Sequence, residues 1–206
     1  MVNIKEQKAK LRNKIWDLME EKSVTRFPRP VYGRVPNFEG AEKAAERLKE
    51  LDEWRKAKTI FANPDSPQKP VRELALRESK VVIMASPRLK KGYLRIEPAD
   101  VKGVERAAAT IKGAFKWGKH VGKKLPKADL VITGSVGVDK QGNRLGKGGG
   151  YGDKEIARLK QDKSITAKTP IVTTVHELQI VKAVPSEPHD QKVNIIISPK
   201  RIIRVK

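Results

Sequence analysis

Six glycines lie between Gly142 and Gly152, in a stretch that joins an apolar, strand-like run to a helix-like segment. Glycines at this density let the backbone take left-handed conformations and bring its N–H groups close to an anion. The positive end of a helix dipole is expected near Asp153, at the same place. Arg144 and Lys147 add fixed positive charge. The stretch therefore predicts a site for phosphate groups.

Asp153 adds a carboxylate to this site. Mg²⁺ typically binds through one or two carboxylates together with phosphate oxygens and water, so the combination indicates a nucleoside triphosphate site. The spacing fits neither common phosphate motif, because no Ser or Thr follows Gly146-Lys147 and no register of the glycines gives G-x-G-x-x-G. On pattern alone, a flexible glycine loop with solvated lysines is the alternative.

The composition excludes several other kinds of site. The 206 residues include no cysteine, which excludes disulfides, Cys-ligated zinc and thiolate nucleophiles. The spacing of His120, His176 and His189 supports neither a transition-metal site nor a Ser-His-Asp triad. The formal net charge of +21 favours polyanionic partners such as nucleotide phosphates, polyglutamylated metabolites or nucleic acid. No apolar run approaches the roughly 20 residues that cross a bilayer, so we expect a cytoplasmic protein without a membrane partner.

The elements that must position these residues follow from the apolar pattern. Residues 3–22 have the spacing of an amphipathic helix with a basic face. Prolines between positions 28 and 36 predict an extended crossing segment, and a second helix is expected after Asn37. Helical patterns also cover residues 71–78, 103–112 and 153–162.

Short apolar runs alternate with these helices, which is the pattern of βαβ units. Runs that are apolar without alternation are expected when helices cover both faces of a sheet. We therefore predict one domain over residues 1–206, with an α/β, doubly wound, Rossmann-like fold and a mainly parallel sheet of about five strands. The predicted strands are residues 57–62, 81–85, 129–133, 170–175 and 193–198.

The stretch G-N-R-L-G-K-G-G-G-Y-G-D at 142–153 resembles the G-x-R-L-G-[KR]-G-x-G-Y-Y-D signature of the 5-formyltetrahydrofolate cyclo-ligase (methenyltetrahydrofolate synthetase) family. Lys8 and Arg12 match the family's K-x-x-x-R, and residues 184–203 match its closing V-P-x-x-x-H-D-x-x-V-D-x-I-x-T segment. The segments RVPNF, NPDSPQKPVR and ASPRLKKG are most similar to the methenyltetrahydrofolate synthetase domain-containing branch, without the RNA-recognition module that some members append.

This resemblance implies an ATP- and Mg²⁺-dependent conversion of 5-formyltetrahydrofolate to 5,10-methenyltetrahydrofolate, with release of ADP and phosphate. ATP would phosphorylate the formyl oxygen, and N10 would then attack the activated carbon. Carried over by position, Asp153 would hold Mg²⁺, and Lys8, Arg144 and Lys147 would be catalytic. The residues implied to bind the nucleotide are Lys8, Arg12, Arg144, Gly146, Lys147, Gly148, Gly149, Gly150 and Tyr151.

Two departures from the family pattern concern the substrate side. Gly152 stands where the signature has its second tyrosine, and residues 63–68 replace the acidic-Thr segment that follows the first strand in cyclo-ligases. Asp65 is a folate-binding candidate whose alternative is a helix cap. The other folate-binding candidates are Pro36, Phe38 and Trp117, and Trp117 has core packing as its alternative. For Lys8 and Arg12 the alternative is a solvated helix face.

A second function, binding of RNA or ribosomes, rests on local charge. Residues 112–127 contain six lysines and no acid, and residues 199–206 contain four cations and no acid. Such clusters are typical of contact with a phosphate backbone. Phe115 and Trp117 are the candidate side chains for base stacking.

Overall fold

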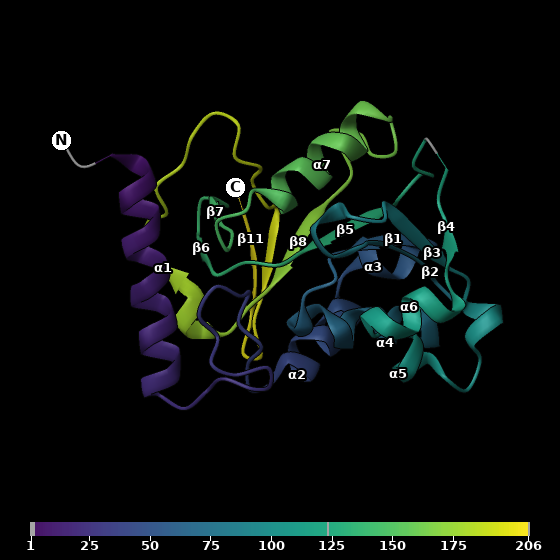
Figure 1. Ribbon diagram of the computed structural model, residues 1–206, viewed down its shortest axis with the longest axis horizontal. Helices are drawn as coiled ribbons and strands as arrows, with labels where there is room; N and C mark the ends of the chain where they lie inside the picture. The colour runs from purple at the N-terminus through teal and green to yellow at the C-terminus, as the bar shows by residue number, and fades with distance from the viewer. Residues whose placement is uncertain (1–2, 123, 206) are drawn as a thin grey trace.

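An eight-stranded sheet forms the centre of the molecule (Figure 1). The computed structural model describes residues 3–122 and 124–205. Five neighbouring strands are parallel, in the order β10-β8-β5-β1-β2, which confirms the mainly parallel sheet predicted from the sequence. Their bounds are β1 (Thr59–Ala62), β2 (Val81–Ala85), β5 (Leu130–Thr133), β8 (Ile171–Thr174) and β10 (Ile195–Ile197).

Three antiparallel strands extend this sheet at its two edges, and the sequence pattern did not predict them. β3 (Tyr93–Ile96) pairs with β2, and β4 (Lys119–His120) pairs with β3. β11 (Ile202–Arg204) pairs with β10 at the opposite edge. Strands of two to four residues are too short to show a period of their own.

Helices cover both faces of the sheet, with α7 on one side and α2, α4, α5 and α6 on the other (Figure 1). The side chains of β1 alternate accordingly, because Ile60 and Ala62 join one buried cluster and Phe61 joins the other. The predicted helix over 103–112 is two shorter helices, and Thr110 caps the second by accepting a hydrogen bond from the Gly113 N–H. The helices are α1 (Ile4–Glu21), α2 (Ala41–Glu46), α3 (Asp52–Lys56), α4 (Lys69–Arg77), α5 (Glu105–Ala108), α6 (Ile111–Trp117) and α7 (Tyr151–Gln161).

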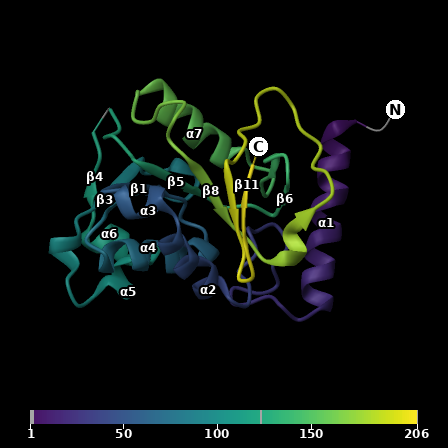
Figure 2. The same cartoon turned by 180° about the vertical axis from the view of Figure 1, so that it is seen from behind.

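The predicted N-terminal helix, α1, lies at one end of the molecule beside β6 (Gly137–Asp139) and β7 (Arg144–Leu145), as both views show (Figures 1 and 2). These two strands and β9 (Ile180–Val181) form a second, three-stranded sheet. The contact is close, because a Cβ added at Gly137 would lie 2.6 Å from the Ile15 Cδ1. The small sheet therefore separates the glycine stretch from β5 and places it between α1 and α7.

None of the helices in the described ranges is both long enough and apolar enough to cross a membrane.

Candidate active site

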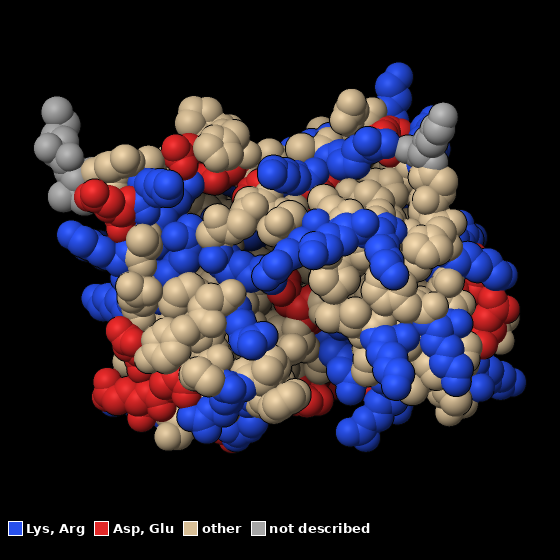
Figure 3. Space-filling view, viewed as in Figure 1, with Lys and Arg blue, Asp and Glu red and all other residues tan. Residues whose placement is uncertain are grey.

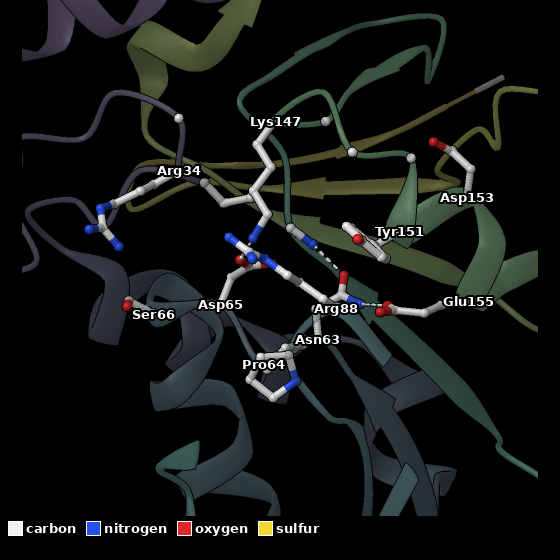
Figure 4. A pocket seen from close by; sticks show the side chains of 18 of the residues that line it. Arg34, Asn63, Pro64, Asp65, Ser66, Arg88, Lys147, Tyr151, Asp153 and Glu155 are labelled. Carbon is white, nitrogen blue, oxygen red and sulfur yellow. Dashed lines mark hydrogen bonds and ion pairs between the residues drawn. The ribbon is translucent and has the colours of Figure 1, made fainter. Parts of the chain in front are cut away.

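A pocket of about 330 Å³ lies where the parallel strands β1, β2 and β5 end and α7 begins (Figure 4). This is the edge at which open α/β sheets usually bind ligands. Residues from several separate parts of the chain line the pocket. Most of them come from the segments 33–35, 63–66, 87–88 and 144–155.

The glycine loop, residues 146–150, forms one wall of this pocket between β7 and α7. Gly148 and Gly150 have φ values of 108° and 65°, a region that residues with a side chain rarely adopt. Gly150 directly precedes α7, and no side chain caps this helix end. Arg12 supports the loop from α1, because its Nε donates to the Gly146 carbonyl at 2.7 Å. The first turn of α7 is thus presented to the pocket as the sequence predicts.

Arg144 is held beneath the start of α7 and is 5% exposed. Its Nη2 lies 2.5 Å from the Asp153 Oδ1, and its Nη1 donates to the Gly134 carbonyl at 3.2 Å. A Cβ added at Gly152 would lie 3.2 Å from the same guanidinium. The position that carries the second tyrosine in the signature is therefore crowded by Arg144 in this chain. Arg144 lines the pocket, but a carboxylate already partners its charge.

Lys147 and Asp65 meet across the pocket, with the lysine Nζ 2.8 Å from the Asp65 Oδ1. Asp65 precedes the short 3₁₀ helix η2 (Ser66–Gln68), and its side chain makes no capping hydrogen bond to that helix. The capping alternative for Asp65 is therefore wrong. Its carboxylate faces the glycine loop instead, which joins the segment after β1 to the loop before α7.

Lys8 is placed differently from its expected role at the phosphates. It is 8% exposed, so it is not part of a solvated face, and its Nζ lies 2.6 Å from the Asp190 Oδ2 and 2.8 Å from the Glu187 Oε2. Burial lowers the pKa of Lys8, but the hydrogen bonds to Asp190 and Glu187 outweigh it and raise this pKa. Lys8 does not line the pocket. Two carboxylates instead fix it between α1 and the segment before β10.

Asn63 and Glu155 form a buried pair at the pocket wall that no sequence pattern predicts. The Asn63 Nδ2 donates to the Glu155 Oε2, while the Gly134 N–H donates to the Asn63 Oδ1 at 2.9 Å. Glu155 is 3% exposed. Burial, followed by repulsion from Asp65, raises the pKa of Glu155 to about 8. The only sequence signal was position, since Asn63 follows β1 and Glu155 lies one turn into α7.

Two arginines of the pocket are also not predicted as site residues by any sequence pattern. Arg34 and Arg88 both line it and are exposed. Within residues 3–122 and 124–205, neither guanidinium has a hydrogen bond or an ion pair. Figure 4 shows Arg34 at the outer side of the pocket, and Arg88 extending in front of Asn63. The segment ASPRLKKG carried the Arg88 signal, but only as part of a family resemblance.

The aromatic candidates divide between the pocket and the core. Tyr151 lines the pocket, and its ring lies 2.8 Å from the position of a Cβ added at Gly149. Phe38 is 1% exposed in the core, with its ring centroid 6.1 Å from that of His176. Trp117 packs against the core at the end of α6 and lies outside the pocket lining. The structure therefore does not bring Phe38 or Trp117 to this pocket, because the core takes up their rings.

Pro36 is buried as well, and it too lies outside the pocket lining. The basic segment 112–127 begins in α6 and continues into β4, and Lys123 lies outside the described residues. The Lys116 Nζ lies 4.5 Å from the Trp117 ring centroid. The half-buried Trp117 is thus poorly placed to stack on a base, and RNA binding stays a prediction. Lys and Arg side chains spread over the whole face of the molecule seen in Figure 3.

Asp153 is the pocket carboxylate that fits a magnesium ion. Its Oδ1 accepts hydrogen bonds from Arg144 and from the Gln191 N–H at 3.0 Å. Its Oδ2 has no hydrogen-bond partner among the described residues. One carboxylate oxygen together with phosphate oxygens and water is a normal Mg²⁺ ligand set. By contrast, Lys8 already occupies the acidic cluster of Glu187, His189 and Asp190.

Curated proteins similar to this chain carry the expected family name. A "Methenyltetrahydrofolate synthase domain-containing protein" of Bos taurus is 39% identical over 202 residues, covering 95% of this chain and 53% of that protein. The Homo sapiens protein of the same name is 36% identical over 203 residues, with the same coverage. The chain thus spans about half the length of these curated relatives.

Solved structures share the fold. A 5,10-methenyltetrahydrofolate synthetase of Aquifex aeolicus superposes with a TM-score of 0.59 at 22% identity, covering 97% of this chain and 93% of that one. One from Mycoplasma pneumoniae gives a TM-score of 0.54 at 16% identity, covering 97% and 99%. The sequence model of the 5-formyltetrahydrofolate cyclo-ligase family matches residues 4–199. The chain therefore belongs to the 5-formyltetrahydrofolate cyclo-ligase family.

Proposed function

We propose that this chain binds MgATP at the glycine loop and converts 5-formyltetrahydrofolate to 5,10-methenyltetrahydrofolate, releasing ADP and phosphate. The observation that carries the proposal is that the glycine loop, the uncapped start of α7 and Lys147 all line one pocket. Backbone N–H groups at a helix start and a nearby cation are the usual means of holding phosphates. The family membership supplies the reaction.

The charges of the pocket also support a phosphate ligand. Asp65, Asp153 and Glu155 are its acids, and the first two are paired with Lys147 and Arg144. Glu155 accepts from Asn63 instead, and its raised pKa means that the protonated form predominates at neutral pH. Arg34 and Arg88 also line the pocket, and neither has an ion pair among the described residues, so the pocket carries a net positive charge that an anion would neutralise.

Phosphoryl transfer to the formyl oxygen needs positioning and charge neutralisation more than it needs a covalent nucleophile. The site suits this, since cations and backbone groups line it and the chain has no cysteine. Lys147 would exchange its partner Asp65 for a phosphate, while Arg12 and Arg144 hold the loop and the start of α7 in place. Asp153 would hold Mg²⁺, which supplies charge neutralisation on the phosphate oxygens when bound.

An absorbance assay tests this proposal directly. Purified protein is mixed with 5-formyltetrahydrofolate and MgATP, and methenyl absorbance is followed, with Lys147→Ala and Asp153→Ala as site variants. Lys102→Ala, an exposed lysine outside the pocket, is the matched control. We expect an ATP-dependent signal that falls at least tenfold in both site variants and is kept in the control. MgATP binding without any methenyl signal would contradict the assignment of 5-formyltetrahydrofolate as the substrate. Absence of MgATP binding would overturn the whole proposal.

A further inference from the structure

Arg88 is the pocket residue with the most unusual backbone. It lies in the short 3₁₀ segment η3 (Pro87–Leu89) after β2, with φ 55° and ψ 22°, in the left-handed region. Leu89 follows with φ 56°, so two successive residues with side chains take a conformation that favours glycine. Strain of this kind persists only where the surroundings enforce it, and it is concentrated at functional sites.

Two hydrogen bonds and one apolar contact hold this segment in place. The Ser86 N–H donates to the Gly92 carbonyl at 2.8 Å, and the Ser86 Oγ accepts from the Lys91 N–H at 2.9 Å. Leu89 packs against the buried cluster beneath α7. The loop thus packs one partly buried side chain, Leu89, against the core and places the preceding one, Arg88, in the lining of the pocket.

Charge distinguishes Arg88 from the cations of the family signature. Carboxylates hold Lys8, Arg144 and Lys147, so a ligand must displace a partner to gain their full charge. Arg88 has neither an ion pair nor a side-chain hydrogen bond within the described residues. A guanidinium can also bind two oxygens of one phosphoryl group at once. Arg88 lies on the loop after β2, which forms a different wall of the pocket from the glycine loop.

We propose that Arg88 binds the γ-phosphoryl group of ATP during its transfer to the formyl oxygen, as an arginine finger supplied by the chain itself. This inference rests on the proposed function. In the step, a lone pair of the formyl oxygen forms the new bond to the γ-phosphorus. The bond from that phosphorus to the β–γ bridging oxygen breaks, ADP keeps its electron pair, and no proton moves. The guanidinium stabilises the negative charge that spreads over the γ-phosphoryl oxygens in the transition state.

The strained backbone provides a sharp test. Arg88→Gly removes the guanidinium but suits the left-handed conformation better than arginine does, so we expect its melting temperature to equal or exceed that of the unaltered protein. We expect kcat to fall at least 100-fold, since arginine fingers contribute roughly 10³–10⁵ to phosphoryl transfer. The KM for MgATP should change less than fivefold. Lys90→Ala, an exposed position on the same loop outside the pocket lining, should keep full activity.

Two further measurements separate catalysis from folding. Free guanidinium ion should partly restore kcat to Arg88→Gly and should not affect Lys90→Ala. Arg88→Lys should remain at least tenfold slow, because an ammonium group lacks the paired donors. Turnover by the unaltered protein together with an unchanged kcat in Arg88→Gly would overturn the inference alone. Absence of turnover in the unaltered protein would instead overturn the proposed function on which it rests.

Discussion

Lys147 and Asp65, 82 residues apart in the chain, form a 2.8 Å ion pair across the mouth of the pocket. The lysine comes from the glycine loop, and the carboxylate comes from the segment after the first strand. Asp65 therefore neutralises the positive charge of Lys147, which a bound phosphate would otherwise contact. The pair is a contact that ligand binding must break.

Asp65→Asn should tighten MgATP binding. It removes the competing charge while keeping the size of the side chain, and exposed pairs of this kind are worth about 0.2–1 kcal/mol, so we expect a gain of roughly two- to fivefold. Lys147→Ala should weaken binding by at least tenfold. Calorimetric titration with a non-hydrolysable ATP analogue measures both. Equal affinities in all three proteins would show that Lys147 does not meet the nucleotide.

Gly152→Ala should disturb Arg144 without altering any charge. The added Cβ would lie 3.2–3.4 Å from three atoms of the guanidinium, which must then shift by a few tenths of an ångström. We expect a loss of about 1–2 kcal/mol in the free energy of unfolding, measured by urea titration. Gly122→Ala, whose Cβ would meet nothing within 4 Å among the residues that the structure describes, should change it by less than about 0.5 kcal/mol. A loss of equal size in both variants would contradict the placement of Arg144.

Glu155→Gln should change how stability depends on pH. The pKa of Glu155 is about 8 in the folded chain, whereas its ordinary value is 4.5. Between these two pH values the folded chain therefore keeps a proton on Glu155 that the unfolded chain has lost. Stability of the unaltered protein therefore falls as pH rises through this window. Glutamine keeps an oxygen that can accept from Asn63, so the variant should be more stable at pH 8.5 by at least about 1 kcal/mol and differ little at pH 4.5. Melting temperatures across pH check this, with an unchanged pH profile as the contrary result.

Lys8→Met should destabilise the fold more than it weakens nucleotide binding. It leaves Asp190 and Glu187 near the start of α1 without their cation, which typically costs about 3–5 kcal/mol for a buried pair. Asp190→Asn should cost stability too, yet it frees Lys8 from one of its partners. If Lys8 instead holds phosphate, Asp190→Asn will bind MgATP more tightly than the unaltered protein. Paired denaturation and titration curves distinguish the two roles.

Much of the fold was predictable because parallel strands covered on both faces leave continuous apolar runs. The VVIMA run coincides with β2, and the helix expected over 3–22 differs from α1 by one residue at each end. The antiparallel edges were missed because β4 has only two residues and both are exposed. Pairing with a neighbour, rather than local pattern, makes such segments strands.

The candidate site was predictable where local sequence sets the backbone, as in the glycine loop before α7. It was not predictable where a side chain's partner lies far along the chain. Nothing near Lys8 shows that Asp190 will bury it, and nothing near Lys147 shows that Asp65 will pair with it. Arg88 was passed over because neither composition nor spacing shows a left-handed backbone at a residue that is not glycine.

The contact between Lys8 and Asp190 spans 182 residues, which has a consequence for the order of assembly during synthesis. At about 5–20 residues per second, a ribosome needs roughly 9–36 s between adding these two residues. During that interval Lys8 of α1 is present, but the carboxylates that neutralise it have not yet been synthesised. The first helix therefore gains its last contacts only when the segment just before β10 has been translated. In a stalled nascent chain that ends before residue 187, α1 should be accessible to proteases.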